Sequence, residues 1–180
     1  TNASPGNLSC YLPNLKIKGA SRILGINPGA SYGSAKRWYP EQFAKIAIKL
    51  SDNFDIMIFG GPDELEFAEE IEIHLIKNNI SNYLNLAGKT SISELTNYIS
   101  KLDLFITGDS GPMHIAASLE IPTIALFGPT NPLETSQWKN PHSVIIKQDL
   151  ECQPCMKRTC PLKHHNCMKL IDATEVIDSI

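Results

Sequence analysis

Short apolar runs, each followed by a turn-forming segment, recur along the chain and predict five buried strands. They span residues 22–27, 55–59, 83–86, 104–106 and 123–127. Glycine, proline or small polar residues follow each run, which is how a short buried strand ends. The spacing between the runs leaves room for a helix in each interval.

The intervals carry apolar residues at helical spacing, which predicts helices. These helices are expected over residues 41–50, 63–76, 91–102 and, at the end of the chain, 172–180. The third begins with a capping-box pattern, Ser91 with Glu94, and carries Ile92, Leu95, Ile99 and Leu102 in register. Strands that alternate with helices predict an α/β fold, a Rossmann-like, mostly parallel sheet with helices on both faces.

The loops that follow the five strands are the expected binding edge, because ligands of such sheets lie beyond the carboxyl ends of the strands. These loops are residues 28–36, 60–64, 88–90, 108–114 and 128–131. Their convergence favours a nucleotide-type site. Neither a G-x-G-x-x-G segment after the first strand nor a Walker sequence occurs, which disfavours the usual dinucleotide dehydrogenases and P-loop enzymes.

The segment 107–114, Thr-Gly-Asp-Ser-Gly-Pro-Met-His, reads as strand end, turn and helix start. Pro112 suits the first turn of a helix, and Ser110 or Asp109 can cap it. The N–H groups at a helix start attract anions, whereas the Asp109 carboxylate repels phosphate. Asp109 is therefore expected to face hydrogen-bond donors such as a ribose hydroxyl. A capped structural turn is the alternative.

Composition places the chain among ordinary globular domains. It has 180 residues, 42% of them hydrophobic and 19% charged, enough for one domain with a core. The net charge of −3 argues against binding along a nucleic-acid backbone. Residues 1–20 are expected to be a lead-in or linker, residues 21–180 the domain, and the chain part of a longer protein.

Six segments resemble the motifs of glycosyltransferase family 9, the bacterial heptosyltransferases. They are Asn-Pro-Gly-Ala (27–30), Ala-Lys-Arg-Trp (35–38), Gly-Gly-Pro-Asp-Glu (60–64), Leu-Ala-Gly-Lys-Thr (86–90), Thr-Gly-Asp-Ser-Gly-Pro-Met-His (107–114) and Gly-Pro-Thr-Asn-Pro (128–132). The cysteine-bearing tail is most similar to the branch that adds the second heptose of the lipopolysaccharide inner core.

The resemblance implies a cytoplasmic enzyme with two Rossmann-like halves, the GT-B arrangement. Such an enzyme transfers heptose from ADP-heptose to the lipopolysaccharide or lipooligosaccharide inner core, with inversion and without a metal or other cofactor. This chain resembles the carboxyl-terminal, donor-binding half. The acceptor half, with the catalytic aspartate, is absent, so the chain alone is expected to be inactive. A GT-B enzyme using a different nucleotide-sugar and a non-catalytic nucleotide-binding module are the alternatives.

The resemblance also assigns donor-binding roles. Lys36 is expected to bind the diphosphate and stabilise the leaving group, and Glu64 to bind the ribose. The full set is Ser31, Lys36, Glu64, Thr90, Asp109, Ser110, Gly111 and His114. Ser31 would reach the diphosphate, Thr90 would border the adenine, and the others would meet the phosphates and heptose. Solvated side chains remain the alternative for Lys36 and Glu64, and a core residue for His114.

Four cysteines cluster near the end of the chain. They are Cys152, Cys155, Cys160 and Cys167, with two, four and six residues between them. Such spacing is compatible with zinc, with disulfides or with reduced thiols. We expect no metal and a structural role, away from the converging loops. The basic residues Lys157, Arg158 and Lys163 would allow peripheral contact with the inner membrane, with a solvated loop as the alternative.

Overall fold

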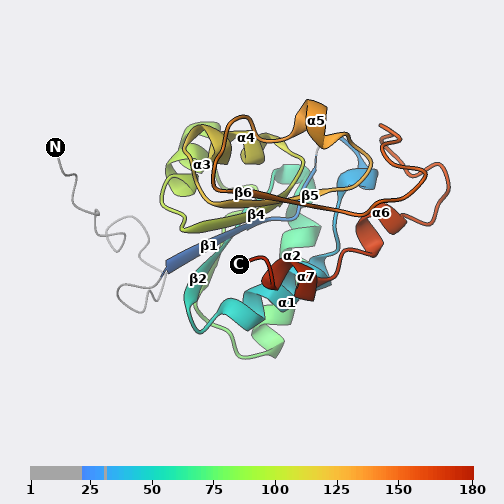
Figure 1. Cartoon of the computed structure of the whole chain (residues 1–180). Coiled ribbons are helices and arrows are strands. Elements are labelled where there is room, and N and C mark those ends of the chain that lie inside the picture. Colours follow the sequence, from blue (N-terminus) through green and yellow to red (C-terminus); the bar gives the residue numbers. More distant parts are fainter. Residues whose placement is uncertain (1–21, 31) are drawn as a thin grey trace.

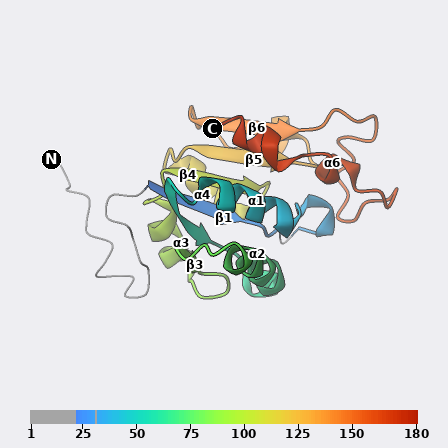
Figure 2. The ribbon, with the colours of Figure 1, turned by 90° about the horizontal axis from the view of Figure 1, so that it is seen from below.

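The computed structural model describes residues 22–30 and 32–180 and forms one six-stranded parallel sheet (Figure 1). The expected lead-in, residues 1–20, and Ser31 lie outside the described residues. The strands are β1 Arg22–Asn27, β2 Phe54–Ile58, β3 Tyr83–Asn85, β4 Leu104–Gly108, β5 Thr123–Phe127 and β6 Ser143–Lys147. Their order across the sheet is β3-β2-β1-β4-β5-β6, seen from below in Figure 2.

Helices cover both faces of the sheet, which confirms the predicted Rossmann-like α/β fold. The helices are α1 Pro40–Leu50, α2 Leu65–Lys77, α3 Ile92–Ile99, α4 Gly111–Ser118, α5 Pro132–Thr135, α6 Asn166–Lys169 and α7 Ala173–Ile177. Two 3-10 turns, η2 Ser34–Lys36 and η3 Pro62–Glu64, precede α1 and α2. Helices α1, α2 and α7 lie below the sheet in Figure 1, and α3 and α4 lie above it. Within the described part of the chain, no helix combines the length and the apolar character that crossing a membrane requires.

The two faces of the sheet explain why the strands read as apolar runs. In β1, Leu24 and Ile26 pack with the residues of α1 and α2, whereas Ile23 packs with those of α3 and α4. In β2, Ile56 packs on the side of α1 and α2, and Met57 packs on the side of α3 and α4. Because neighbouring residues of a strand point to opposite faces, a strand that is covered on both sides must be apolar at nearly every position.

Strand β6 was not predicted from the sequence. Among the described strands it pairs with β5 alone, at the edge of the sheet. Val144 and Ile145 are about 40% and 39% exposed, and Ile146 is its one buried residue. A half-covered edge strand lacks the uniformly apolar pattern of the inner strands. A long irregular segment, and not a helix, follows β6. The alternation of strands and helices that predicted the other strands therefore does not extend to this one.

The helical register that Ile92 shares with Leu95 and Ile99 does not bury Ile92. Ile92 is 78% exposed, although Leu95 is partly buried and Ile99 fully buried against the sheet. The capping box is confirmed: Ser91 Oγ accepts the Glu94 N–H, and the Glu94 carboxylate accepts the Ser91 N–H. This cap makes Ile92 the first residue of α3. At that position the side chain lies outside the core, which the later residues of the helix cover.

Candidate functional site

The sheet has a topological switch point between β1 and β4. From β1 the chain proceeds outward to β2 and β3, and it then returns to build β4, β5 and β6 on the other side. The loops that follow two such neighbouring strands run in opposite directions. A crevice therefore forms at the carboxyl ends of these strands, and this is where such folds bind ligands. Asn27, the last residue of β1, ties the two sides together: its amide donates to Thr107 Oγ1 (3.2 Å) and to Ser110 Oγ (3.3 Å).

A cavity of about 260 Å³ opens at this switch point. Its lining comes from the end of β1, from the loops after β1, β2, β3 and β4, and from α3 and α4: Asn27, Gly29, Ala30, Gly60, Gly61, Pro62, Glu64, Thr90, Ile92, Leu95, Ser110 and Pro112. Ligand pockets commonly measure about 300–1,000 Å³, so this one suits one part of a larger ligand, such as a nucleoside. The structure thus brings three predicted site residues, Glu64, Thr90 and Ser110, into one cavity.

Glu64 is a buried carboxylate, only 7% exposed, on the wall of this cavity. Its Oε2 accepts the Gly61 N–H at 2.7 Å, which orients the side chain. A Cβ atom added to Gly29 would lie 1.9 Å from the Glu64 carboxyl carbon, so glycine is required at that position for the carboxylate to lie there. A fixed, partly shielded carboxylate can accept hydrogen bonds from hydroxyl groups of a ligand.

Ile92 and Leu95 form an apolar wall on the α3 side of the cavity. The sequence reasoning missed this role because it treated both side chains only as part of the apolar register of the helix. An exposed isoleucine at the mouth of a cavity supplies a flat apolar contact that a purine ring can cover. The capping box just before Ile92 was the available signal, since it placed Ile92 at the end of the helix.

The start of α4 is an anion-binding feature at the same edge. Ser110 is its N-cap residue, but the Ser110 side chain makes no capping hydrogen bond and instead contacts Asn27 and Thr107. Pro112 has no N–H, and the Met113 N–H donates to the Ser110 carbonyl (3.2 Å), which leaves the Gly111 N–H to face a ligand at the positive end of the helix dipole. A Cβ added to Gly111 would meet no atom within 4 Å, so open space lies in front of this turn.

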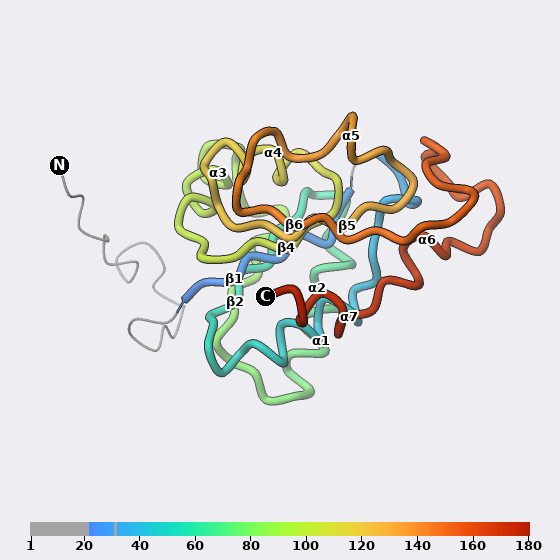
Figure 3. The backbone as a smooth tube through the Cα atoms, in the orientation of Figure 1, coloured from blue at the N-terminus to red at the C-terminus, as the bar shows by residue number. Residues whose placement is uncertain are grey.

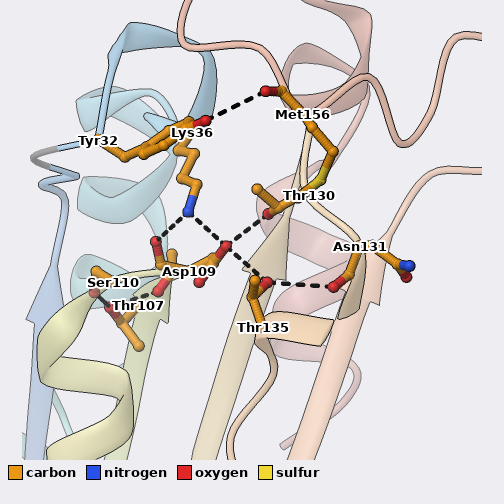
Figure 4. A network of polar contacts seen from close by, with 10 residues as sticks. Tyr32, Lys36, Thr107, Asp109, Ser110, Thr130, Asn131, Thr135 and Met156 are labelled. Carbon is orange, nitrogen blue, oxygen red and sulfur yellow. Dashed lines mark hydrogen bonds and ion pairs between the residues drawn. The ribbon is translucent and has the colours of Figure 1, made fainter. Parts of the chain in front are cut away.

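Lys36 and Asp109 form a shielded ion pair beside α4 (Figure 4). Lys36 Nζ lies 2.6 Å from Asp109 Oδ2, and the two side chains are 10% and 5% exposed. The same oxygen accepts hydrogen bonds from Thr130 Oγ1 (2.7 Å) and Thr135 Oγ1 (3.1 Å). The Tyr32 ring lies on another side of the ammonium, 4.6 Å from Nζ. The expected donors around Asp109 are thus present, and they come from the protein itself.

Thr130 and Thr135 were not predicted as site residues. Thr130 lies in the Gly-Pro-Thr-Asn-Pro segment, which was noted as a motif without a role for its threonine. Thr135 ends α5 and carried no sequence signal. Of the other predicted residues, His114 is exposed on α4 and does not line the switch-point cavity, and Ser31 lies outside the described residues.

The cysteine-bearing segment contacts the site loops, so the prediction that it lies away from them is wrong. The Arg158 carbonyl accepts the Ala35 N–H (3.0 Å), and the Met156 N–H donates to the Pro129 carbonyl (2.8 Å). His165 Nε2 lies 2.8 Å from the Ala35 carbonyl oxygen. The physical reason is β6: a sixth parallel strand ends at the same edge as the others, so the segment that follows begins there (Figure 3).

The four clustered cysteines are free thiols. All four border one small cavity of about 20 Å³, together with His164. In the part of the chain that the structure describes, no group of three or more histidine, cysteine, aspartate or glutamate side chains is arranged to hold a metal ion. The cavity that the four cysteines border is also lined by Ala35, next to Lys36, and by Pro129.

We predict that the four thiols differ in reactivity. Backbone N–H groups, that of His165 first, lower the pKa of Cys160, whereas burial raises the pKa of Cys167 to about 11. Since the thiolate is the nucleophile, iodoacetamide at pH 8 should label Cys160 well before Cys167, of which only about one in a thousand is ionised at that pH. Peptide mass spectrometry over time measures the order.

The control for this labelling is Cys167→Ser, which should leave the rate at Cys160 unchanged. Labelling of Cys167 ahead of Cys160 in the folded protein would contradict the environments described here.

The fold and its switch-point site define a Rossmann-like α/β domain of the kind that binds nucleotides. The chain belongs to glycosyltransferase family 9 (heptosyltransferase), whose family profile matches residues 8–166. It is 49% identical over 167 residues to lipooligosaccharide heptosyltransferase 2 of Campylobacter jejuni, covering 92% of this chain and 52% of that protein. It is 37% identical over 130 residues to lipooligosaccharide heptosyltransferase 2 of Haemophilus influenzae, covering 72% and 38%.

A solved structure agrees with these sequence matches. The chain superposes on the Escherichia coli ADP-heptose lps heptosyltransferase II with a TM-score of 0.78 and 26% identity, covering 98% of this chain and 50% of that one. The chain spans about half the length of the Campylobacter jejuni relative and of the Escherichia coli structure.

Proposed function

We propose that this chain is the ADP-heptose-binding domain, residues 21–180, of an inverting heptosyltransferase with the GT-B arrangement. The enzyme would add heptose to the inner core of lipopolysaccharide or lipooligosaccharide. The observation that carries the proposal is the shielded Lys36 beside the uncapped start of α4, next to a nucleoside-sized cavity at the switch point. The names of the relatives, and their lengths of about twice this chain, support the same assignment.

The donor would occupy the site in the order nucleoside, diphosphate, sugar. The adenosine would lie in the cavity, with its base against Ile92 and Leu95, its ribose hydroxyls donating to Glu64, and Thr90 at the base edge. The diphosphate would then reach the Gly111 N–H at the start of α4 and the ammonium of Lys36. The heptose would lie beyond Ser110 and Gly111, where the space in front of the helix is open.

The reaction would be a direct displacement. An acceptor hydroxyl attacks the anomeric carbon of the heptose, the bond to the diphosphate oxygen breaks, and ADP leaves. Negative charge grows on that leaving oxygen, where Lys36 and the helix N-terminus stabilise it. The base that takes the proton of the hydroxyl would come from the acceptor half. Catalysis would occur in the cytoplasm, and Lys157, Arg158 and Lys163 would favour contact with an anionic membrane surface.

Calorimetry on this chain tests the assignment of the donor site. ADP is expected to bind more tightly than adenosine, because only ADP reaches Lys36 and α4, and more tightly than UDP, because the cavity would hold a purine. The chain alone should transfer no heptose, since proton removal is typically worth ~10²–10⁴ in rate and the acceptor would not be held.

Three results would count against the proposal. Absence of ADP binding at millimolar ligand would remove the donor site. A preference for UDP would indicate a different nucleotide-sugar. Transfer by the chain alone would mean that it carries its own base and is not a half-enzyme.

A further inference from the structure

We propose that Thr130 and Thr135 are positioning residues for Lys36. Their two hydroxyls hold the Asp109 carboxylate so that it fixes the Lys36 ammonium beside the start of α4, ready for an anionic ligand. The inference rests on the proposed function, in which Lys36 meets the donor diphosphate. Neither threonine would touch the reacting atoms; both would act through Asp109.

Three donors converge on a single oxygen, Asp109 Oδ2. They are Lys36 Nζ at 2.6 Å, Thr130 Oγ1 at 2.7 Å and Thr135 Oγ1 at 3.1 Å. These groups come from separate segments: Lys36 from η2 after β1, Asp109 from the loop after β4, and the threonines from the β5 loop and α5. Figure 4 shows the carboxylate between the lysine on one side and the two hydroxyls on the other. The contact therefore links three loops at the carboxyl edge of the sheet.

The geometry also solves an electrostatic problem. A carboxylate close to a diphosphate site repels the ligand, and a carboxylate paired with the Lys36 ammonium competes with the ligand for its charge. Two hydroxyl donors on the same carboxylate oxygen disperse its negative charge, so that less of the Lys36 charge is neutralised. An unsupported carboxylate at this depth would instead be free to turn toward the ligand.

The ammonium is held in place but is not fully used. It has three N–H donors. One N–H donates to Asp109 Oδ2, with Nζ at 2.6 Å from that oxygen. A second has only a long contact with the Asp109 carbonyl oxygen, which lies 3.5 Å from Nζ. The Tyr32 ring covers another side, at 4.6 Å. A charged donor that is fixed before the ligand arrives loses little freedom on binding, which is the condition for strong stabilisation of developing charge.

A purely structural role is the competing explanation. Thr130 is 4% exposed, and Thr135 Oγ1 also contacts the Asn131 carbonyl oxygen at 3.3 Å, so both hydroxyls could simply anchor the loop between β5 and α5. The two explanations differ in what they affect. Loss of an anchor would weaken the whole site, whereas loss of positioning would weaken only the recognition of phosphate.

The experiment compares ADP with adenosine on the chain and its variants by calorimetry, with thermal unfolding recorded for each. Thr130→Val and Thr135→Val remove the hydroxyl and keep the shape of the side chain. Each is expected to lower ADP affinity about 3- to 10-fold, the effect of one hydrogen bond, and to leave adenosine affinity within about twofold. Thr130→Ser and Thr135→Ser should restore ADP binding, because serine keeps the hydroxyl.

The matched control is Thr123→Val, at the start of β5, the strand whose following loop carries Thr130. Thr123 is 1% exposed, and its hydroxyl donates to the Ile121 carbonyl, far along β5 from the ion pair. This variant should leave the ratio of ADP to adenosine affinity unchanged even if it lowers the unfolding temperature. Lys36→Ala, measured alongside, gives the ratio expected when the ammonium is gone.

The possible results separate the two proposals. If wild type prefers ADP, Lys36→Ala removes that preference and the valine variants do not, then the positioning role is wrong and the donor site stands. A parallel fall in ADP and adenosine affinity in the valine variants would assign the threonines to loop anchoring. That result would also overturn the positioning role. If wild type shows no preference for ADP over adenosine, the proposed donor site fails and the positioning role fails with it.

Discussion

Replacing Lys36 by alanine is expected to remove ~2.7–4 kcal/mol of transition-state stabilisation, a loss of roughly 10²–10³ in turnover. The reason is the place of the ammonium: it is 10% exposed, fixed by Asp109, and beside the helix start at which a diphosphate would accumulate charge. The measurement is kcat and donor KM in a full-length heptosyltransferase that contains this domain. Adenosine affinity should not change, because the nucleoside cavity does not include Lys36.

The control for this variant is Lys45→Ala, which removes an exposed lysine of α1 away from the switch-point cavity. It should leave turnover and donor affinity as they are. Unchanged turnover together with unchanged donor affinity in Lys36→Ala would eliminate the proposed role of this lysine.

Replacing Trp38 by alanine is expected to have the largest effect on stability, about 3–5 kcal/mol in the free energy of unfolding. Trp38 is 2% exposed, packs edge-to-face on Phe43 with ring centroids 4.8 Å apart, and donates its indole N–H to the Ile171 carbonyl at 3.1 Å. Removing it leaves a cavity between α1 and the carboxyl-terminal segment and an unpaired carbonyl. Urea unfolding followed by circular dichroism measures the loss.

The second tryptophan of the chain provides a matched control. Trp138 is 77% exposed, so Trp138→Ala should change the free energy of unfolding by no more than about 0.5 kcal/mol. Similar losses in the two variants would show that the burial of Trp38 does not stabilise the fold as described. Trp38→Phe should fall between them, because it keeps an aromatic ring beside Phe43 but loses the indole hydrogen bond and part of the buried ring volume.

Much of the architecture follows from local pattern. The strands 22–27 and 123–127 begin and end at the predicted residues, because apolar runs bounded by turn residues have one favourable structure when both faces are covered. The capping box at Ser91 places the start of α3 for the same kind of reason, since the two side chains satisfy N–H groups that no helical partner can reach. These signals involve residues close together in the sequence.

The candidate site was predicted in part. Glu64, Thr90 and Ser110 meet in one cavity because parallel strands deliver their following loops to a single edge, which the strand–helix alternation already implied. The ion pair between Lys36 and Asp109 joins residues 73 positions apart, so no local pattern could reveal it. Their roles toward the donor remain predictions that the binding experiments test.

The sequence by itself determined the alternating strands and helices, the edge at which the loops gather, and the family, because these depend on period, spacing and motif order. Tertiary structure alone decided three further features: the edge strand β6, the contact of the cysteine segment with the Lys36 loop, and the threonines that hold Asp109. Each of these features depends on which segments, distant in the chain, become neighbours when the strands assemble into the sheet. Nothing in the sequence around Thr135 indicates that its hydroxyl will contact the Asp109 carboxylate.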